Sequence, residues 1–130
     1  MNTRTVLTAS AVISLVFALA SLLIPATIGP MYGFGTGPTE ILLGRYFGVA
    51  LLGIGLINWF ARNMDYASLR PILLGNLIGD AAGLVLSLMG TLAGTLTSLG
   101  WLSVALYLLL ALGFGYLYFM GQPVSIRQRA

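Results

Sequence analysis

The chain contains no cysteine and no histidine among its 130 residues. The absence of cysteine excludes disulfides, thiol catalysis, thiolate metal sites and cysteine-ligated iron–sulfur clusters. The absence of histidine removes the usual ligand of haem and zinc and the usual general base near neutral pH. We therefore expect no metal site, no bound cofactor, no catalytic residues and no enzymatic activity.

Charged side chains are also scarce, at 7% of the chain against the roughly 25% that is usual for a soluble protein. Hydrophobic residues make up 58%, so the chain lacks the side chains that a water-exposed surface requires. The formal charge is +3, with no run of basic residues that would form a nucleic-acid-binding patch. We infer an integral membrane protein that is solvated by the lipid bilayer and does not bind nucleic acid.

Long apolar segments separate the few charges. Four of them approach the roughly 20 residues that cross about 30 Å of hydrocarbon at 1.5 Å per residue. The predicted spans are residues 5–28, 41–61, 71–89 and 99–120, with Pro71 as the first helical residue of the third. The runs are continuous rather than alternating, and four strands cannot close a membrane barrel. The sequence predicts one all-α domain, residues 1–130, folded as an up-down-up-down bundle of four transmembrane helices.

Arginine placement predicts the orientation of this bundle. Five of the six arginines lie at the N-terminus, between the second and third spans, or at the C-terminus: Arg4, Arg62, Arg70, Arg127 and Arg129. The other two loops contain no Lys or Arg, so the positive-inside rule predicts that both termini are cytoplasmic. The exclusive use of arginine fits a bacterial chain, which places the protein in the inner (plasma) membrane. The alternative is a cleaved signal peptide ending near residues 18–20, but the apolar run continues beyond that point.

Small residues recur every three or four positions within the spans. Lipid tails are as apolar as leucine, so helices associate in a membrane through close contact and interhelical hydrogen bonds. The expected packing positions are Ser10, Ser14, Ala18 and Ser21 in the first span, Gly44, Gly48 and Gly55 in the second, and Gly75, Gly79 and Gly83 in the third. We expect the second and third spans to form the tight centre and the leucine-rich fourth span to face lipid. A homo-oligomer interface is the alternative use of such a stripe.

Four polar residues fall inside the spans: Arg45, Asn58, Asn76 and Asp80. A charge near the bilayer centre costs at least about 2.5–3.5 kcal/mol, so such residues are rarely without a role. Asp80 lies about 14 Å from the inner end of its span, near the midplane. It is either a carboxylate that binds a proton or an ion, or a hydrogen-bonded lock between helices. Asn58 and Asn76 lie at similar depths, and we expect them to form an interhelical amide pair.

Arg45 lies near the outer end of the second span, where three interactions are open to it. Its side chain can reach outward to the membrane surface, pair with Glu40, or extend toward Asp80. The axial gap to Asp80 is about 10 Å by the helical rise, so the last pairing requires tilted helices.

Several motifs resemble small four-helix bacterial membrane proteins in the broad neighbourhood of the DoxX-like proteins. The motifs are Glu40-Ile-Leu-Leu-Gly-Arg45-Tyr-Phe-Gly48, Gly53-x-Gly55, Trp59-Phe-Ala-Arg62 and Gly100-Trp101. The resemblance covers the layout of nearly the whole chain and implies a four-helix bundle. Some DoxX-like proteins are linked to thiol or quinone chemistry. Thiol chemistry does not carry over to a chain without cysteine. No residue of this chain matches a catalytic motif of the DoxX-like proteins, so no catalytic role is transferred.

Three functions remain open at this point. The first is a structural or accessory subunit that acts through helix–helix contacts with other membrane subunits or with copies of itself. The second is a small transporter or channel with Asp80 and Arg45 in an intramembrane polar path. The third is a lipid-binding protein or a membrane enzyme, for which Asp80, Glu40 and the arginines would have to supply the chemistry. The short loops and the lack of a catalytic cluster favour the first.

Overall fold

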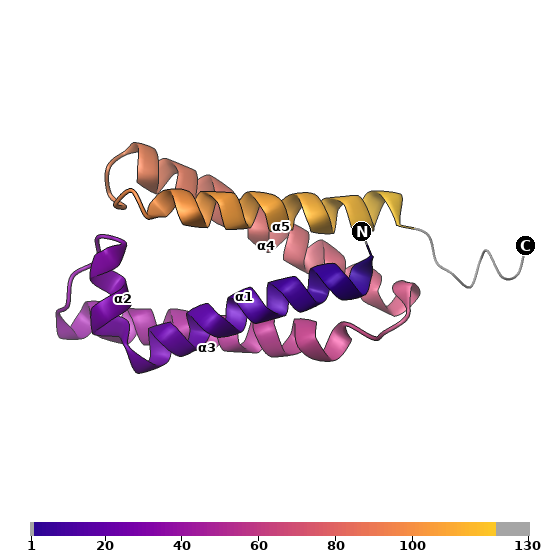
Figure 1. Cartoon of the computed structure of the whole chain (residues 1–130), viewed down its shortest axis with the longest axis horizontal. Helices are drawn as coiled ribbons and strands as arrows, with labels where there is room; N and C mark the ends of the chain where they lie inside the picture. The colour runs from indigo at the N-terminus through magenta and orange to yellow at the C-terminus, as the bar shows by residue number, and fades with distance from the viewer. Residues whose placement is uncertain (1, 122–130) are drawn as a thin grey trace, which may run out of the picture.

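The computed structural model describes residues 2–121 and contains no strand in that range. Its five helices are α1 (Thr3–Leu23), α2 (Pro25–Met31), α3 (Pro38–Ala61), α4 (Tyr66–Leu92) and α5 (Gly100–Met120). All except the short α2 are long and apolar enough to cross a membrane, and successive long helices run in opposite directions (Figure 1). The prediction of an all-α fold with four membrane-spanning helices is confirmed. Arg127 and Arg129, which support the predicted orientation, lie outside the described residues.

The first predicted span, residues 5–28, is divided into two helices. Helix α1 ends at Leu23, and Ile24 leaves the helical conformation with φ −132° and ψ 51°. Pro25 then begins α2, because its ring disfavours a helical conformation at the preceding residue and it has no N–H to continue α1. The apolar composition continues across this break, which is why the sequence pattern alone does not place it.

Helix α4 begins at Tyr66, five residues before the predicted start at Pro71. Asp65 is its N-cap, accepting hydrogen bonds from the Ser68 hydroxyl at 3.0 Å and the Ser68 backbone N–H at 3.2 Å. These bonds stabilise the charged carboxylate, so the pKa of Asp65 lies below its usual value. Pro71 therefore lies inside the helix, where its missing N–H removes one bond, to the carbonyl of Ala67.

The four long helices pack as two pairs. Helix α1 packs along α3 and α4 packs along α5, and the two pairs form two layers (Figure 1). Helices α3 and α4 follow one another in the chain, yet their backbones rarely approach closely. The prediction that the second and third spans form the tight centre is therefore wrong. Each of them makes its closest contacts with the helix at the other end of its own hairpin.

The two pairs meet most closely at their ends. At the end where α1 begins and α5 ends (Figure 1), here called the termini end, one apolar core joins all four long helices. Its buried members are Val6, Leu7, Ala61, Leu69, Leu73, Phe114 and Leu117. At the opposite end, here called the α2 end, the backbone N–H of Thr97 donates to the carbonyl of Tyr32 at 3.2 Å. The Thr97 hydroxyl also donates to the carbonyl of Met31, so α2 is fastened to the α4–α5 loop.

Candidate functional site

The glycines of α3 provide the contact surface for α1. A Cβ atom at Gly48 would lie 3.1 Å from the carbonyl oxygen of Ala18, and one at Gly55 would lie 2.8 Å from Cγ of Leu15. Gly44 is looser, with Pro25 at 3.7 Å from the corresponding position. The predicted small-residue stripe of α1 is buried along its length: Ser10, Ser14, Ala18 and Ser21. These stripes act as predicted, with α1 as the partner of α3.

The glycines of α4 do not share one function. The ring of Tyr107 from α5 lies directly over Gly83 and leaves no room for a side chain there. At Gly75 and Gly79, in contrast, an added Cβ would have nothing within 4 Å apart from the adjoining residues and backbone of α4 itself. Each four-residue step turns about 40° around a helix of 3.6 residues per turn, so Gly83 lies about 80° from Gly75. Of the three packing positions predicted in the third span, Gly83 is therefore packed within the bundle, and Gly75 and Gly79 are open.

Gly75 and Gly79 belong to an exposed apolar surface on one side of α4, here called the α4 open face. Its members are all exposed and uncharged: Pro71, Gly75, Ile78, Gly79, Ala82 and Leu86. Ile78 and Leu86 are 62% and 69% exposed, whereas the two glycines and Ala82 present little or no side chain on this face. Gly53 of α3 is also open on its outer side, but Val49 and Ile57 flank it one turn away in either direction.

The predicted amide pair is present and links three helices. Asn58 Nδ2 donates to Asn76 Oδ1 at 2.8 Å, and Asn76 Nδ2 donates to Asn58 Oδ1 at 2.9 Å. Asn58 Nδ2 also donates to the hydroxyl of Ser10 on α1 at 3.0 Å. Asn58 is only 1% exposed. This network spans α3 and α4 where their backbones lie apart, so it connects the two helix pairs. Ser10 is predicted as a packing residue, and its hydroxyl serves as an acceptor as well.

Asp80 lies in the middle of the bundle without the partner that a buried carboxylate requires. Its Oδ2 atom is buried and accepts no hydrogen bond from residues 2–121. The hydroxyl of Tyr32 is the other buried side-chain oxygen in this range without a partner. Tyr107, whose ring covers Gly83 one turn from Asp80, lies within electrostatic range of both groups. Tyr107 of α5 thus lies near both Asp80 of α4 and Tyr32, the residue that follows α2.

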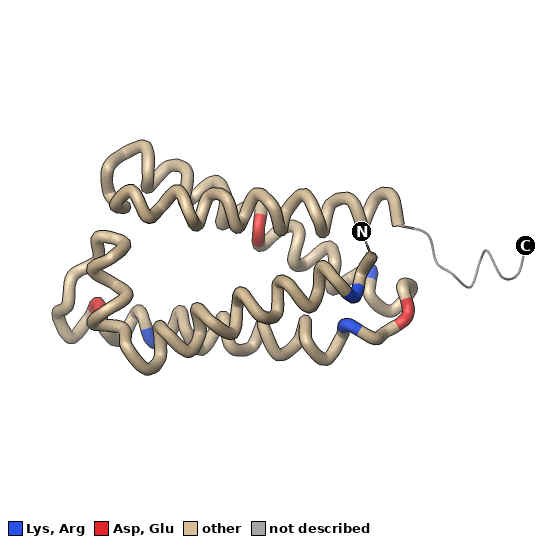
Figure 2. Tube along the Cα trace, viewed as in Figure 1, with Lys and Arg blue, Asp and Glu red and all other residues tan. Residues whose placement is uncertain are grey.

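Arg45 is not part of this group. Charged positions gather at the two ends of the molecule, with one acidic position partway along (Figure 2). Arg45 is exposed, and no hydrogen bond joins it to Asp80 Oδ2. The carboxylate of Glu40 lies over Gly35 and Gly37, in the loop that precedes α3. Of the three alternatives for Arg45, the structure agrees with the first, because the side chain is exposed near the α2 end.

At the termini end, aromatic side chains hold two of the arginines. The guanidinium of Arg62 lies 3.8 Å from the centre of the Trp59 ring, and that of Arg70 lies 4.6 Å from the centre of the Tyr118 ring. The hydroxyl of Tyr66 donates to the carbonyl of Leu117 at 2.7 Å, which ties the start of α4 to the end of α5. Two of the arginines used to predict the orientation are therefore held against aromatic rings of the bundle.

Comparison of this chain with protein-family models, with curated proteins and with solved structures finds no match in any of the three. The resemblance to DoxX-like proteins therefore stays a prediction, and function has to be argued from the residues described above.

Proposed function

We propose that this chain is an accessory membrane subunit that docks through the α4 open face onto a transmembrane helix of another protein. The observation that carries the proposal is the unused pair of glycines at Gly75 and Gly79. Gly48, Gly55 and Gly83 are each covered by a neighbouring helix of the same chain, whereas these two have nothing above them. Glycine in a helix costs about 0.5–1 kcal/mol relative to alanine, so it is a poor choice for a surface that meets only lipid.

The chemistry of this face defines the partner it fits. The face is uncharged along its length, so it suits an apolar helix within the bilayer. The absence of side chains at two successive turns permits a close backbone approach, which is the main source of attraction between helices in lipid. A crossing helix would meet the α4 backbone at Gly75 and Gly79, with Ile78 and Leu86 packed against its sides. A chain with short loops and few reactive groups would act by stabilising or positioning a larger protein.

Native mass spectrometry after extraction in a mild detergent tests this proposal. We expect the wild-type chain to travel in a complex that contains at least one different subunit. Gly79→Leu should abolish this association, because the new side chain keeps the partner helix away from the α4 backbone. Gly53→Leu is the matched control, since it adds the same side chain to an open position on α3, and it should leave the complex intact. Recovery of the wild type only as the 13.7 kDa monomer or its multiples would contradict the proposal.

A second candidate function, proton transfer through the membrane, has one specific observation in its favour. Asp80 Oδ2 and the Tyr32 hydroxyl are both buried and unpartnered within residues 2–121, and Tyr107 lies near both. An unpaired buried carboxylate is far more costly than a neutral carboxylic acid, so a proton on Asp80 reduces the cost of burial. Titratable groups inside a membrane commonly mark proton relays. Arg45, which the sequence predicts in this path, is not part of this relay.

Proton flux into vesicles measures this second function. With a pH-sensitive dye trapped inside, we expect Asp80→Asn to reduce flux to the level of protein-free vesicles. The amide keeps the shape of the side chain and cannot exchange a proton at neutral pH. The circular dichroism spectrum and melting temperature of the variant should match those of the wild type. If wild-type and Asp80→Asn vesicles leak protons equally, or if the variant only melts earlier, Asp80 is a structural residue.

A further inference from the structure

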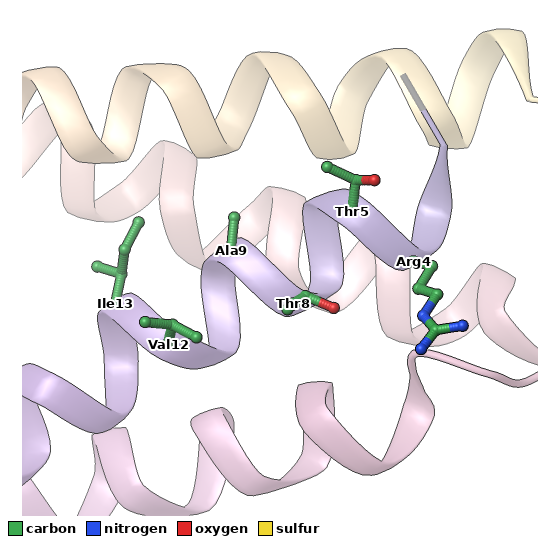
Figure 3. Close-up of a pocket in the computed structure, with 6 residues that line it drawn as sticks. All are labelled: Arg4, Thr5, Thr8, Ala9, Val12 and Ile13. Atoms are coloured by element: carbon green, nitrogen blue, oxygen red, sulfur yellow. The ribbon is translucent and has the colours of Figure 1, made fainter.

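An open groove of about 520 Å³ follows the surface of α1 at the termini end of the bundle. It is lined by Arg4, Thr5, Thr8, Ala9, Val12 and Ile13 (Figure 3). Figure 3 shows Thr5, Ala9 and Ile13 on the side of α1 that faces α5, and Arg4, Thr8 and Val12 on the opposite side of the helix, with the guanidinium of Arg4 at its N-terminal end. Polar groups therefore occupy one end of the groove and apolar side chains the other.

We propose that this groove binds one anionic phospholipid, with its phosphate at Arg4 and one acyl chain along Ala9, Val12 and Ile13. The inference is independent of the proposed docking function, because it concerns α1 and not the α4 open face. The order of the lining residues favours a lipid as the occupant. The groove runs from a cationic side chain through two hydroxyls to apolar side chains, and a phospholipid runs from its phosphate through the glycerol esters to its acyl chains.

The length of the groove fits one leaflet. From Arg4 to Ile13 the helix rises about 14 Å at 1.5 Å per residue. Half of the roughly 30 Å hydrocarbon core of a bilayer is of similar length. An acyl chain that starts below Arg4 would thus reach the midplane near Ile13 without leaving the groove.

Arg4 is the arginine with a free guanidinium at this end of the described chain. Arg62 lies over Trp59 and donates to its carbonyl, and Arg70 lies over Tyr118. No hydrogen bond or ring contact holds Arg4 within residues 2–121, and the side chain is exposed. Thr5 and Thr8 line the same end of the groove, and their hydroxyls can donate to phosphate oxygens. An arginine is well suited to this task because its planar donors match phosphate geometry.

The balance of charge favours an anionic headgroup over a zwitterionic one. Among the described residues, the termini end carries Arg4, Arg62 and Arg70 against Asp65, a net charge of +2. The α2 end carries Arg45 and Glu40, which cancel. Basic residues at a membrane surface attract anionic lipids, and this attraction weakens with salt.

Lipid retention in native mass spectrometry tests the proposal. The purified full chain is incubated with phosphatidylglycerol or phosphatidylcholine of identical acyl chains, and the fraction carrying one lipid is compared. We expect the wild type to retain phosphatidylglycerol severalfold more often than phosphatidylcholine. Arg4→Gln should remove this preference, whereas Arg45→Gln, the matched change at the α2 end, should preserve it.

A second variant tests the apolar half of the groove. Ala9→Phe adds a bulky ring to an exposed position without changing the charge, so it should reduce retention of both lipids and leave the fold intact. Equal retention of the two lipids by the wild type would overturn the proposal. So would identical behaviour of Arg4→Gln and Arg45→Gln, or an Ala9→Phe variant that retains lipid as the wild type does.

Discussion

Replacement of Gly55 by leucine is expected to separate α1 from α3 and to cause a large loss of stability. Even a Cβ at this position would lie 2.8 Å from Cγ of Leu15 and 3.3 Å from the carbonyl oxygen of Ala11. The Leu15 side chain can move, but the Ala11 carbonyl belongs to the α1 backbone and cannot. Overpacking of this kind typically costs about 1–3 kcal/mol, and a displaced helix costs more.

The effect is measured by unfolding in mixed micelles, with helicity followed by circular dichroism as a denaturing detergent is added. Gly53→Leu is again the control, because it places the same side chain on the same helix where an added Cβ would have nothing within 4 Å apart from the adjoining residues and backbone of α3 itself. We expect Gly55→Leu to unfold at a clearly lower denaturant fraction than Gly53→Leu, which should resemble the wild type. Equal stability of the two variants would show that α3 does not pack against α1 through this glycine.

Replacement of Asn58 by leucine should also cause a large loss of stability, in this case through unpaired polar groups. The change removes both bonds of the amide pair and the bond to Ser10. Measured interhelical hydrogen bonds in membranes average about 0.6 kcal/mol, so three lost bonds amount to about 2 kcal/mol. Asn76 Nδ2 keeps its bond to the carbonyl of Ile72, but Asn76 Oδ1 loses its donor, which adds a desolvation cost of about 1–3 kcal/mol. We expect a total loss of about 3–5 kcal/mol by the same unfolding measurement.

A double-mutant cycle isolates the amide pair. In Asn58→Leu/Asn76→Leu no orphaned amide remains between α3 and α4, so the double variant should be more stable than the sum of the two single losses predicts. Strict additivity would mean that the two amides do not depend on one another and that the network does not connect the helix pairs.

The features that sequence predicts well are those encoded within one helix. Hydropathy over some 20 residues is a local property, so all four spans are found even though their ends are displaced. The break at Pro25 escapes prediction because the residues beyond it are as apolar as those before it. The start of α4 escapes it because Asp65 and Ser68 form a helix cap within a segment that is also polar enough to be an irregular loop.

The pairing of the helices is harder to predict, because any small-residue stripe fits any other. The stripes on α1, α3 and α4 are visible in the sequence, but nothing local to α3 shows that it packs against α1 instead of α4. Gly75, Gly79 and Gly83 share a four-residue spacing, although the helical drift turns Gly83 toward Tyr107 and leaves the other two open. The amide pair is predictable, since two asparagines at matching depth in lipid have few other partners.

The pairing of charged residues, such as Asp80 and Arg45, is as hard to predict from sequence as the pairing of helices. Both are recognisable in the sequence as costly residues, and a pairing between them is one of the interactions it allows. The depth of a residue follows from its position in the span, but the side of the helix that faces its neighbours does not. Arg45 is exposed at the α2 end, and the titratable group that lies near Asp80 is Tyr107 of α5.

Photo-crosslinking in intact membranes tests most directly whether the α4 open face contacts another protein. A photoreactive amino acid is placed at Gly79 in one variant and at Gly53 in another, and the crosslinked products are separated by mass after irradiation. The proposed docking predicts one discrete adduct with a different membrane protein from position 79 and only lipid adducts from position 53. Lipid adducts alone from both positions, or an adduct at position 79 that contains only a second copy of this chain, would contradict it.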